Sequence, residues 1–577
     1  MRTRVLSIRE RFRDPVREGD PGDFTTTFRI LPIALLACVV GVIGALLAWV
    51  LLRLIAVFTN AFFYQRLSDS NVSPADAHIG LWVLLVPAIG GLIVGFMARY
   101  GSDRIRGHGI PEAIEAILMN GSKVQPRVAI LKPLSSAIAI GSGGPFGAEG
   151  PIIVTGGAFG SITSQVLHLS ASERKTLLVA GAASGMSATF GAPVAAVMLA
   201  VELLLFEWKP RSLIPVAVAS ATAATVRHWL LAPAPLFPTP PHTEFIGAWG
   251  MVSCLIIGLS AGVLSTVLTA AVYAGEDAFH RLPVHWMWWP AIGGVAVGIC
   301  GLIFPEALGV GYNNIELLLS GDAPTRIIIG VLLVKSVMWA IALSSGTSGG
   351  ILAPLLMMGA AMGAAESHFL PGGDPALWPL IAMGAILGGT MRAPLTGVVF
   401  SLELTHDTNI MLPLLAAVMV AHGFTVLTLR RSILTEKLSR RGHHLAYEYA
   451  VDVLDGMLVR QGMRTDLVAI PADATLAQIS RLDMPDLYES QPAYPIIGED
   501  SRLLGVISAG DLSRLLINRD GDLAAATVRF GDIPTESALT VSQDVTMREA
   551  ADALGSSGRS AIAVTSASLR PGLYAPS

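Results

Sequence analysis

A carboxylate inside an apolar stretch is the residue of this sequence best placed to do chemistry. Glu149 lies in the run Gly-Ser-Gly-Gly-Pro-Phe-Gly-Ala-Glu-Gly-Pro at residues 141–151 and is the only acidic residue between Lys132 and Glu173. Burying an unpaired carboxylate is costly, so a functional role is the default hypothesis. The glycines and prolines around it interrupt one helix and begin another, whose free backbone N–H groups can bind an anion. The run predicts an anion site with a carboxylate beside it; the alternative is a helix-packing motif with an inert glutamate.

The elements that must position this site are membrane helices. Mean hydropathy is +0.60 and only 14% of the 577 residues are charged, against about 25% in soluble proteins. We therefore expect a polytopic membrane protein in a lipid bilayer, and no enzyme. The net charge of −4 gives no indication of a nucleic-acid partner, and the three cysteines lie in apolar runs that predict neither disulfides nor a metal site. No cofactor is expected.

The apolar runs predict the spans and their interruptions. They cover residues 31–63, 81–97, 128–140, 177–206 and 214–231, of which the third is too short to span and the fourth is broken at 191–193. A proline-rich loop at 232–242 separates this half from the next. The arginine-rich residues 1–29 are expected to form a cytoplasmic tail.

The second half repeats the first. Lys132 and Lys335 are 203 residues apart, and so are the runs Pro-Ala-Ile-Gly-Gly at 87–91 and 290–294. Ala-Pro followed by a glutamate, Glu202 or Glu403, recurs at an offset of 201. Internal repeats with broken helices in matching positions are typical of transport folds, whose binding site lies where the interrupted segments meet.

Three motifs in order resemble those of the ClC chloride channel and transporter family. Gly-His-Gly-Ile-Pro at 107–111 is similar to the family's G-S-G-I-P, Gly-Ala-Glu-Gly-Pro at 147–151 to G-R/K-E-G-P, and Gly-Ile-Leu-Ala-Pro at 350–354 to G-I/x-F-A-P. The resemblance implies an all-α membrane fold of two inverted repeats, about 80–231 and 283–430, inside a transport domain at 30–442. It also implies a homodimer with one anion pathway per subunit, voltage-gated in some members.

The same resemblance implies roles for individual residues. Glu149 is expected to be the gate, its carboxylate occupying an anion site when the pathway is closed. Chloride or another small anion is expected to be the transported ligand. The anion-binding positions that the resemblance implies are His108, Gly109, Ile110, Gly147, Gly150, Ile351, Leu352 and Leu434.

Three of these positions depart from the family pattern. Leu352 in place of the phenylalanine is the mildest change, since that residue contributes through its backbone. His108 stands where the family has a serine, and either faces the anion path or is a packed histidine. Leu434 stands where the family usually has a tyrosine near the last membrane helix. Without either side-chain ligand, backbone amides must carry more of the anion coordination.

Proton coupling is the main functional alternative. Proton-coupled members carry a second glutamate at the position of Leu203, directly after Glu202, and leucine cannot relay a proton. We therefore expect a gated passive chloride channel, with a Cl⁻/H⁺ antiporter as the alternative. In that case Glu207, one helical turn further on, is the first candidate relay, unless it is only an interfacial charge.

The composition changes near residue 442, and residues 443–577 predict a small cytoplasmic α/β region. Its internal repeat resembles a tandem pair of CBS domains with an incomplete second copy. The resemblance implies that Ser508 and Asp511 can hold an adenosine nucleotide; the alternative is a dimerisation and stability module. Both termini are expected in the cytoplasm, and the transport domain in the plasma membrane.

A remote alternative is an intramembrane serine protease. Gly-Thr-Ser-Gly at 346–349 matches a Gly-x-Ser-Gly motif, and His422 could act as the base for Ser348. However, the same glycines are already explained as the repeat partners of 143–147.

Overall fold

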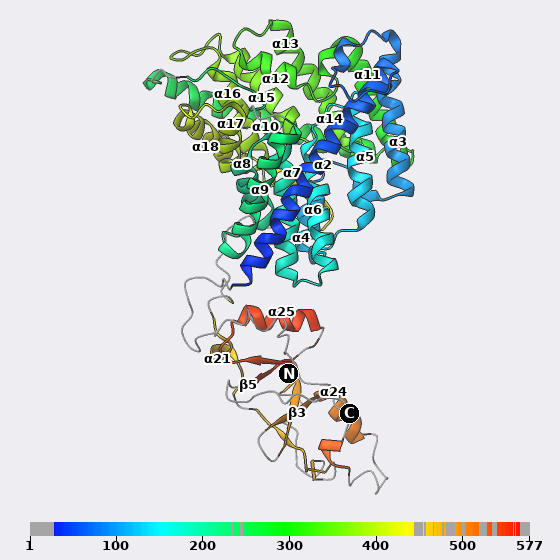
Figure 1. Cartoon of the computed structure of the whole chain (residues 1–577), viewed down its shortest axis with the longest axis vertical. Coiled ribbons are helices and arrows are strands. Elements are labelled where there is room, and N and C mark those ends of the chain that lie inside the picture. The colour runs from blue at the N-terminus through cyan, green and yellow to red at the C-terminus, as the bar shows by residue number, and fades with distance from the viewer. Residues whose placement is uncertain are drawn as a thin grey trace, which may run out of the picture. The chain divides into compact units, whose positions relative to one another are not determined.

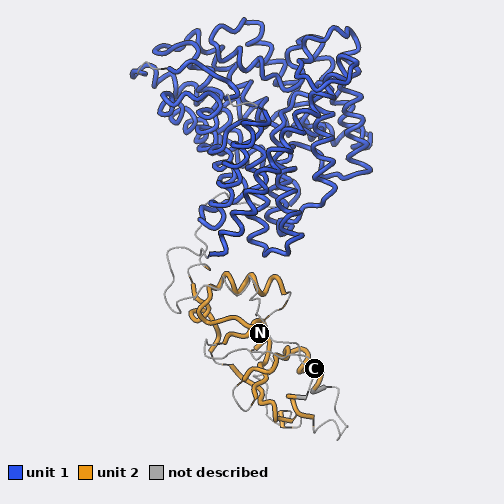
Figure 2. The backbone as a smooth tube through the Cα atoms, in the orientation of Figure 1, with its two compact units in different colours: residues 1–14, 23–448 blue, residues 15–22, 449–577 orange. Residues whose placement is uncertain are grey.

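The computed structural model divides the chain into two compact units (Figure 2), one of residues 1–14 and 23–448 and one of residues 15–22 and 449–577. The structure describes residues 28–231, 235–242, 246–442, 454, 457–465, 467–475, 478–479, 491–498, 502–517, 528–532, 539–557, 559 and 561–565. Most of the predicted N-terminal tail lies outside the described residues. So does the predicted domain boundary after residue 442, which stays a prediction.

The first unit is helical throughout (Figure 1). Its helices in the first half are α2 (Ile30–Tyr64), α3 (Val86–Tyr100), α4 (Ile110–Leu118), α5 (Pro126–Gly141), α6 (Glu149–Val166), α7 (Ala171–Phe190), α8 (Pro193–Leu199) and α9 (Pro210–Leu230), with a π-helical turn η4 (Ala200–Leu205) after α8. Those in the second half are α10 (Ala248–His280), α11 (Trp289–Ile303), α12 (Tyr312–Leu319), α13 (Thr325–Ile329), α14 (Ser336–Ser344), α15 (Leu352–Glu366), α16 (Leu377–Met391), α17 (Pro394–Thr405), α18 (Met411–Thr428) and α19 (Ile433–Arg440), with a π-helical turn η7 (Gly330–Lys335) before α14. The predicted interruptions before Glu149 and after Phe190 are both present.

Six helical segments of the described chain are long and apolar enough to cross a membrane: 30–64, 80–100, 248–280, 286–303, 325–344 and 411–440. Their outward faces carry many exposed apolar side chains, such as Leu35 on α2 and Val267 on α10. The helices α6, α7, α15 and α16 are buried along most of their length, which places them inside the bundle. The expected polytopic membrane architecture is confirmed.

The two repeats contact each other through the same residues. A Cβ atom added to Gly91 on α3 would fall against the carbonyl oxygen of Pro290, and one added to Gly294 on α11 against that of Pro87. Only glycine therefore allows these two helices to cross so closely. Because the contacts are reciprocal, a pseudo-twofold axis passes between α3 and α11.

The breaks after α7 and α16 are also reciprocal. Gly191 ends α7 with a φ of +69°, and its repeat partner Arg392 ends α16 with a φ of +57°. Glu202 accepts hydrogen bonds from the first backbone N–H groups of α17, whereas Glu403 accepts them from those of α8. Each repeat thus caps a helix of the other, as negative side chains at helix N-termini do.

The described part of the first unit begins and ends on the same side of the bundle. Arg29, just before α2, pairs with Glu173 at the start of α7 at 2.5 Å. Arg174 donates to the backbone just after α4, and Arg441, just after α19, pairs with Glu115 on α4 at 2.5 Å. The first and last described residues of this unit, Phe28 and Gly442, therefore both lie near the stretch from α4 to the start of α7.

The second unit contains a three-stranded sheet and a two-stranded sheet. In the first, β1 (Ile470–Pro471) pairs parallel to β2 (Ala493–Ile497), and β2 pairs antiparallel to β3 (Leu503–Ser508), which leads into α24 (Ala509–Ile517). In the second, β4 (Thr540–Ser542) pairs parallel to β5 (Ala563–Thr565), with α25 (Met547–Ser557) between them and a short α21 (Val459–Gly462) nearby in the same unit. The parallel pair recurs in both copies, but in the described residues β4 and β5 have no third strand.

A glycine pair predicts how sensitive the bundle is to packing. Gly156 on α6 and Gly181 on α7 approach so closely that a Cβ at either would overlap the carbonyl oxygen of the other. We expect Gly156→Ala to lower stability by about 1–3 kcal/mol, the usual cost of overpacking. The adjacent Gly157→Ala is the control, since its Cβ would meet nothing closer than 3.4 Å. Thermal unfolding in detergent measures both, and equal midpoints would contradict the packing argument.

Candidate anion site

A pair of backbone hydrogen bonds holds two helix N-termini face to face at the centre of the first unit. The N–H of Gly147 donates to the carbonyl of Gly350 at 3.2 Å, and the N–H of Gly350 donates to Gly147 at 2.8 Å. Helix α6 begins two residues after the first glycine and α15 two residues after the second. The positive ends of two buried helices therefore converge here, which favours a negative charge between them.

The carboxylate of Glu149 occupies this position. Its side chain is fully buried, and Oε1 accepts a hydrogen bond of 3.0 Å from the backbone N–H of Ala353 in the first turn of α15. Oε2 accepts no hydrogen bond from any residue that the structure describes. The glutamate begins α6 but bonds to the other helix, so it spans the gap between the two repeats. A carboxylate at a helix N-terminus stands where a bound anion would stand.

Glycines make room for this carboxylate. A Cβ at Gly147 would overlap the Glu149 carboxyl group, and one at Gly350 would lie 2.6 Å from its Oε1 and Cδ. A Cβ at Gly150 would overlap the backbone oxygen of His108. The predicted positions Gly147 and Gly150 are thus required by close backbone approach, and they line the space around the glutamate.

The first motif is fastened to this centre by a buried lysine. Lys132 on α5 is fully buried and donates to the carbonyl oxygens of Ile105 and Gly107 at 2.8 and 2.7 Å. Gly107 also forms an isolated parallel bridge to Ser348 in the third motif. In the second repeat Lys335 donates in the same way to Ala307 and Gly309. In each repeat, two backbone carbonyl oxygens therefore replace the water that the lysine ammonium group loses on burial.

His108 is brought to the same centre, beside Gly109 and Ile110 at the start of α4. It is 3% exposed, it lines a cavity, and its ring Nδ1 has no hydrogen-bond partner. Lys132 and Lys437 both approach the preceding residue, Gly107. Burial and two nearby ammonium groups favour the neutral ring, which can still donate one N–H bond to an anion. A role for His108 in anion binding stays a prediction.

The remaining predicted ligands differ in what surrounds them. Ile351 and Leu352 are fully buried at the start of α15, beside the Glu149 carboxylate. Leu434 is also fully buried in the apolar core, whereas its neighbour Ile433 lines the cavity. Tyr273 on α10 reaches this place instead, but its hydroxyl donates to the carbonyl of Ile433. The tyrosine proton is therefore already engaged, and no pattern in the sequence pointed to it.

The proton-relay position is apolar as expected. Leu203 is fully buried in the turn η4. Glu207 lies beyond it, with Lys175 and Lys209 at 3.5 and 3.8 Å and Ser212 donating at 2.8 Å. Glu207 is therefore held by two ammonium groups and a hydroxyl at the end of η4.

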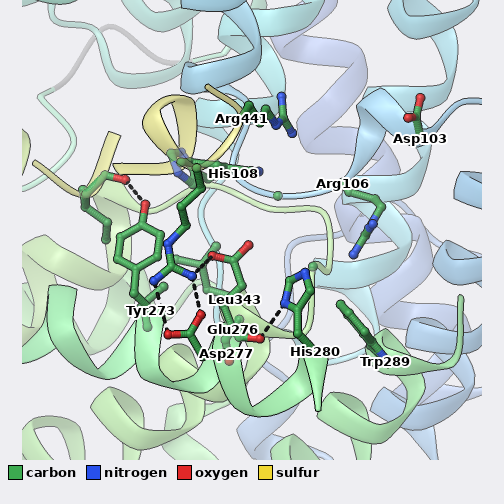
Figure 3. A pocket seen from close by; sticks show the side chains of 17 residues that line it. Asp103, Arg106, His108, Tyr273, Glu276, Asp277, His280, Trp289, Leu343 and Arg441 are labelled. Atoms are coloured by element: carbon green, nitrogen blue, oxygen red, sulfur yellow. Dashed lines mark hydrogen bonds and ion pairs between the residues drawn. The ribbon is translucent and has the colours of Figure 1, made fainter. Parts of the chain in front are cut away.

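The cavity beside His108 has a volume of about 410 Å³ and is shown in Figure 3. It lies between α10, the loop before α4 and α19, at the side of the unit where the chain continues past α19. Among its charged lining groups are Arg106 and Lys437, which sequence reasoning missed because neither belongs to a motif. The spacing of Arg106 from the first motif was the one available signal.

The serine–histidine pair of the protease alternative does not form in the described chain. The hydroxyl of Ser348 is fully buried and shares hydrogen bonds with Ser135 at 3.1 Å and Ser136 at 2.8 Å. His422 lies on α18, and its Nδ1 has no partner. Ser348 thus joins the third motif to α5.

In the second unit, Ser508 and Asp511 bond to each other. The serine hydroxyl donates to the aspartate at 2.7 Å and accepts from the Asp511 N–H at 3.1 Å, at the start of α24. This arrangement is a helix N-cap. It explains both residues without a ligand, and nucleotide binding there stays a prediction.

The two buried lysines predict a matched experiment. Lys132→Met leaves two buried carbonyl oxygens without a donor, so we expect a loss of about 1–3 kcal/mol in stability and weaker chloride binding. Lys335→Met should cost a similar amount, because it also leaves two carbonyls unpaired, but it should change chloride binding less. Thermal unfolding and calorimetric chloride titration separate the two effects. Equal losses of binding would show that Lys132 has no special connection to the first motif.

Comparison with known proteins identifies the family. A family model described as voltage gated chloride channel matches residues 90–426, and a CBS domain model matches residues 458–518. An H(+)/Cl(-) exchange transporter ClcA from Salmonella paratyphi B is 30% identical over 430 residues, which cover 71% of this chain and 87% of the relative. A putative chloride channel protein ClcB-like from Ralstonia nicotianae is 28% identical over 367 residues, covering 62% and 85%.

Solved structures share the architecture. A slow cyanobacterial Cl⁻/H⁺ antiporter aligns with a TM-score of 0.62 and 22% identity, covering 70% of this chain and 97% of that one. A eukaryotic CLC transporter aligns with a TM-score of 0.61 and 17% identity, covering 94% and 96%. Together with the paired repeats, the three motifs and the C-terminal CBS match, these likenesses show that the chain belongs to the ClC family of voltage gated chloride channels and related transporters.

Proposed function

We propose that this protein moves chloride across a membrane in exchange for protons. The main support is the position of the Glu149 carboxylate, which lies between the N-termini of α6 and α15 and accepts a hydrogen bond from the backbone amide of Ala353. A carboxylate that occupies an anion position competes with chloride for it. When protonated, it loses its charge and its preference for the helix ends, and chloride can replace it. One side chain can thus link the movement of the two ions.

The choice between channel and exchanger departs from the expectation based on Leu203. The relative that is 30% identical is named an H(+)/Cl(-) exchange transporter, which supports exchange over the passive channel. The relative named a chloride channel protein is 28% identical over a shorter stretch. Because the identities are close, the residues that would carry the proton must decide.

A proton that reaches Glu149 needs a second titratable group on its route. We propose Glu202 in place of Glu207. Among the residues that the structure describes, the donors to Glu202 are neutral: the N–H groups of Leu395 and Thr396 and the Thr396 hydroxyl, at 3.1, 2.8 and 2.6 Å. Burial disfavours the charged form of a carboxylate that has no cationic partner, so Glu202 is suited to take up a proton.

We also propose that the protein is a homodimer in the plasma membrane, with both ends in the cytoplasm. The N-termini of α8 and α17 meet at a face where Val194 and Leu395 are about half exposed, at 53% and 47%. The homodimer is implied by the family resemblance, and we place the second copy at this face, where two adjoining helix ends expose apolar side chains. The ion pairs of Arg29 with Glu173 and of Arg441 with Glu115, near the limits of the described part of the first unit, support termini on one side.

The first test is the reversal potential of the reconstituted protein under a pH gradient at a fixed chloride gradient. For exchange, we expect the potential to depend on both gradients. Glu149→Gln cannot take up a proton, so chloride flux should continue while the dependence on pH disappears. Glu316→Gln, which changes an exposed carboxylate on α12, is the control and should leave the dependence intact. A wild-type potential that follows chloride alone would establish a channel.

The second test separates the two candidate relays. Glu202→Gln should reduce proton flux on the order of tenfold or more, the scale of losing a positioned proton-transfer group, while chloride flux persists. Glu207→Gln should leave the ratio of the two fluxes unchanged. Proton uptake by the proteoliposomes is followed with a pH electrode. If only Glu207→Gln uncouples the fluxes, the relay runs through the ion-paired carboxylate after all.

A further inference from the structure

The cavity beside His108 is rich in charges, and nearly all of its cations are neutralised. Lys437 pairs with Glu112 at 2.8 Å, and Arg441 pairs with Glu115 at 2.5 Å. Arg440 pairs with Asp277 at 2.5 Å (Figure 3). These pairs join α19 to α4 and α10. Their charges largely cancel, so they leave little attraction for an incoming anion.

Arg106 is different. Its side chain lines the same cavity, yet no carboxylate oxygen of the described residues lies within 4.0 Å of its guanidinium. Its Nε is buried and has no hydrogen-bond partner. The acidic residues Asp103 and Glu276 line the cavity as well, but neither reaches it (Figure 3). An arginine keeps its positive charge under all ordinary conditions. The cavity therefore contains one cation whose charge is not cancelled by a direct partner.

Aromatic rings hold this guanidinium in place. Its Cζ lies 4.5 Å from the ring centroid of Trp286 and 5.7 Å from that of Trp289, at the start of α11. Cation–π contacts stabilise the positive charge of the guanidinium. They use its flat face and leave the N–H donors in its plane free for other partners. On another side, Nη2 lies 2.8 Å from the place where a Cβ of Gly346 would be. The glycine, which has a φ of +77°, thus lets the arginine approach the loop that leads to the third motif.

The position of Arg106 in the chain connects it to the candidate anion site. It stands two residues before His108, in the segment that Lys132 fastens through the carbonyls on either side of it. Both residues line the cavity, but His108 is 3% exposed whereas Arg106 is only partly buried. An anion that enters the cavity can therefore contact the guanidinium of Arg106 and the imidazole of His108, because both line it.

We propose that Arg106 is the anion-capture residue at this mouth of the pathway, where it binds chloride through its guanidinium N–H groups before the ion moves past His108. This inference rests on the proposed transport function and adds a residue that sets anion affinity from one side. A charge-assisted hydrogen bond in a confined space of low dielectric is stronger than one in water. The two tryptophans keep the donor group oriented when no anion is bound.

The test compares three variants in proteoliposomes, with chloride flux measured as a function of chloride concentration at constant ionic strength. Arg106→Gln removes the charge, and we expect the half-saturating chloride concentration to rise about tenfold, the scale of one lost charge-assisted bond. The maximal flux should change little. Arg106→Lys keeps the charge without the planar fork and should restore affinity in part.

Arg104→Gln is the matched control. Arg104 is two residues away in the same segment and does not line this cavity. Its Nη2 is 3.9 Å from Oε1 of Glu115, which is a long ion pair. It should leave the chloride dependence unchanged. Thermal unfolding of each variant checks the fold.

Different results overturn different statements. If the wild type carries no chloride, the proposed function fails. If the wild type carries chloride with a saturable dependence but Arg106→Gln keeps the same half-saturation, Arg106 has only a packing role against the tryptophans. That packing role is also indicated if Arg106→Gln and Arg106→Lys both lower the maximal flux and the unfolding temperature without changing the half-saturation.

Discussion

The reciprocal hydrogen bonds between Gly147 and Gly350 are the constraint on which the rest of the molecule depends. They fix two helix starts at one point, where neither helix can turn its N-terminus toward water. The resulting concentration of unpaired N–H groups in an apolar interior is unfavourable unless something negative lies between them. Glu149 supplies that charge from within the chain, and an anion can supply it from outside. The proposed competition between the two rests on this geometry.

Much of this arrangement could be predicted because the sequence of the first half recurs in the second half. The offsets of 203 and 201 predicted which segments are equivalent, and the structure shows that equivalent residues make equivalent contacts, since Gly91 packs on Pro290 as Gly294 packs on Pro87. The glycine-rich motifs predicted the broken helices, since only glycine tolerates the backbone approaches found there. Patterns that reflect backbone geometry are visible in one sequence because few residue types satisfy them.

Side-chain positions in the cavity were much harder to predict. Leu434 was expected at the site by its place in the chain, yet the cavity is lined by Ile433 and by Tyr273 from a distant helix. Arg106 and Lys437 differ in whether a carboxylate reaches them, which depends on where α10, α4 and α19 happen to end. Such pairings join residues hundreds of positions apart, and no local pattern records them. The channel expectation had the same weakness, because it weighed Leu203 without the environments of Glu202 and Glu207.

The carbonyl-bound lysines have a consequence for how the protein is made. Lys132 finds its partners within the first repeat, and Lys335 within the second, so each half can neutralise its own buried ammonium as it is inserted. The carboxylates follow the opposite rule: Glu149, Glu202 and Glu403 all find their amide donors in the other half. When only the first half has been synthesised, Lys132 therefore already has its hydrogen-bond acceptors. Glu149 and Glu202 lack their amide donors until α15 and α17 have been made. Biogenesis has to keep that half in a polar or protected setting until the last quarter of the transport domain emerges.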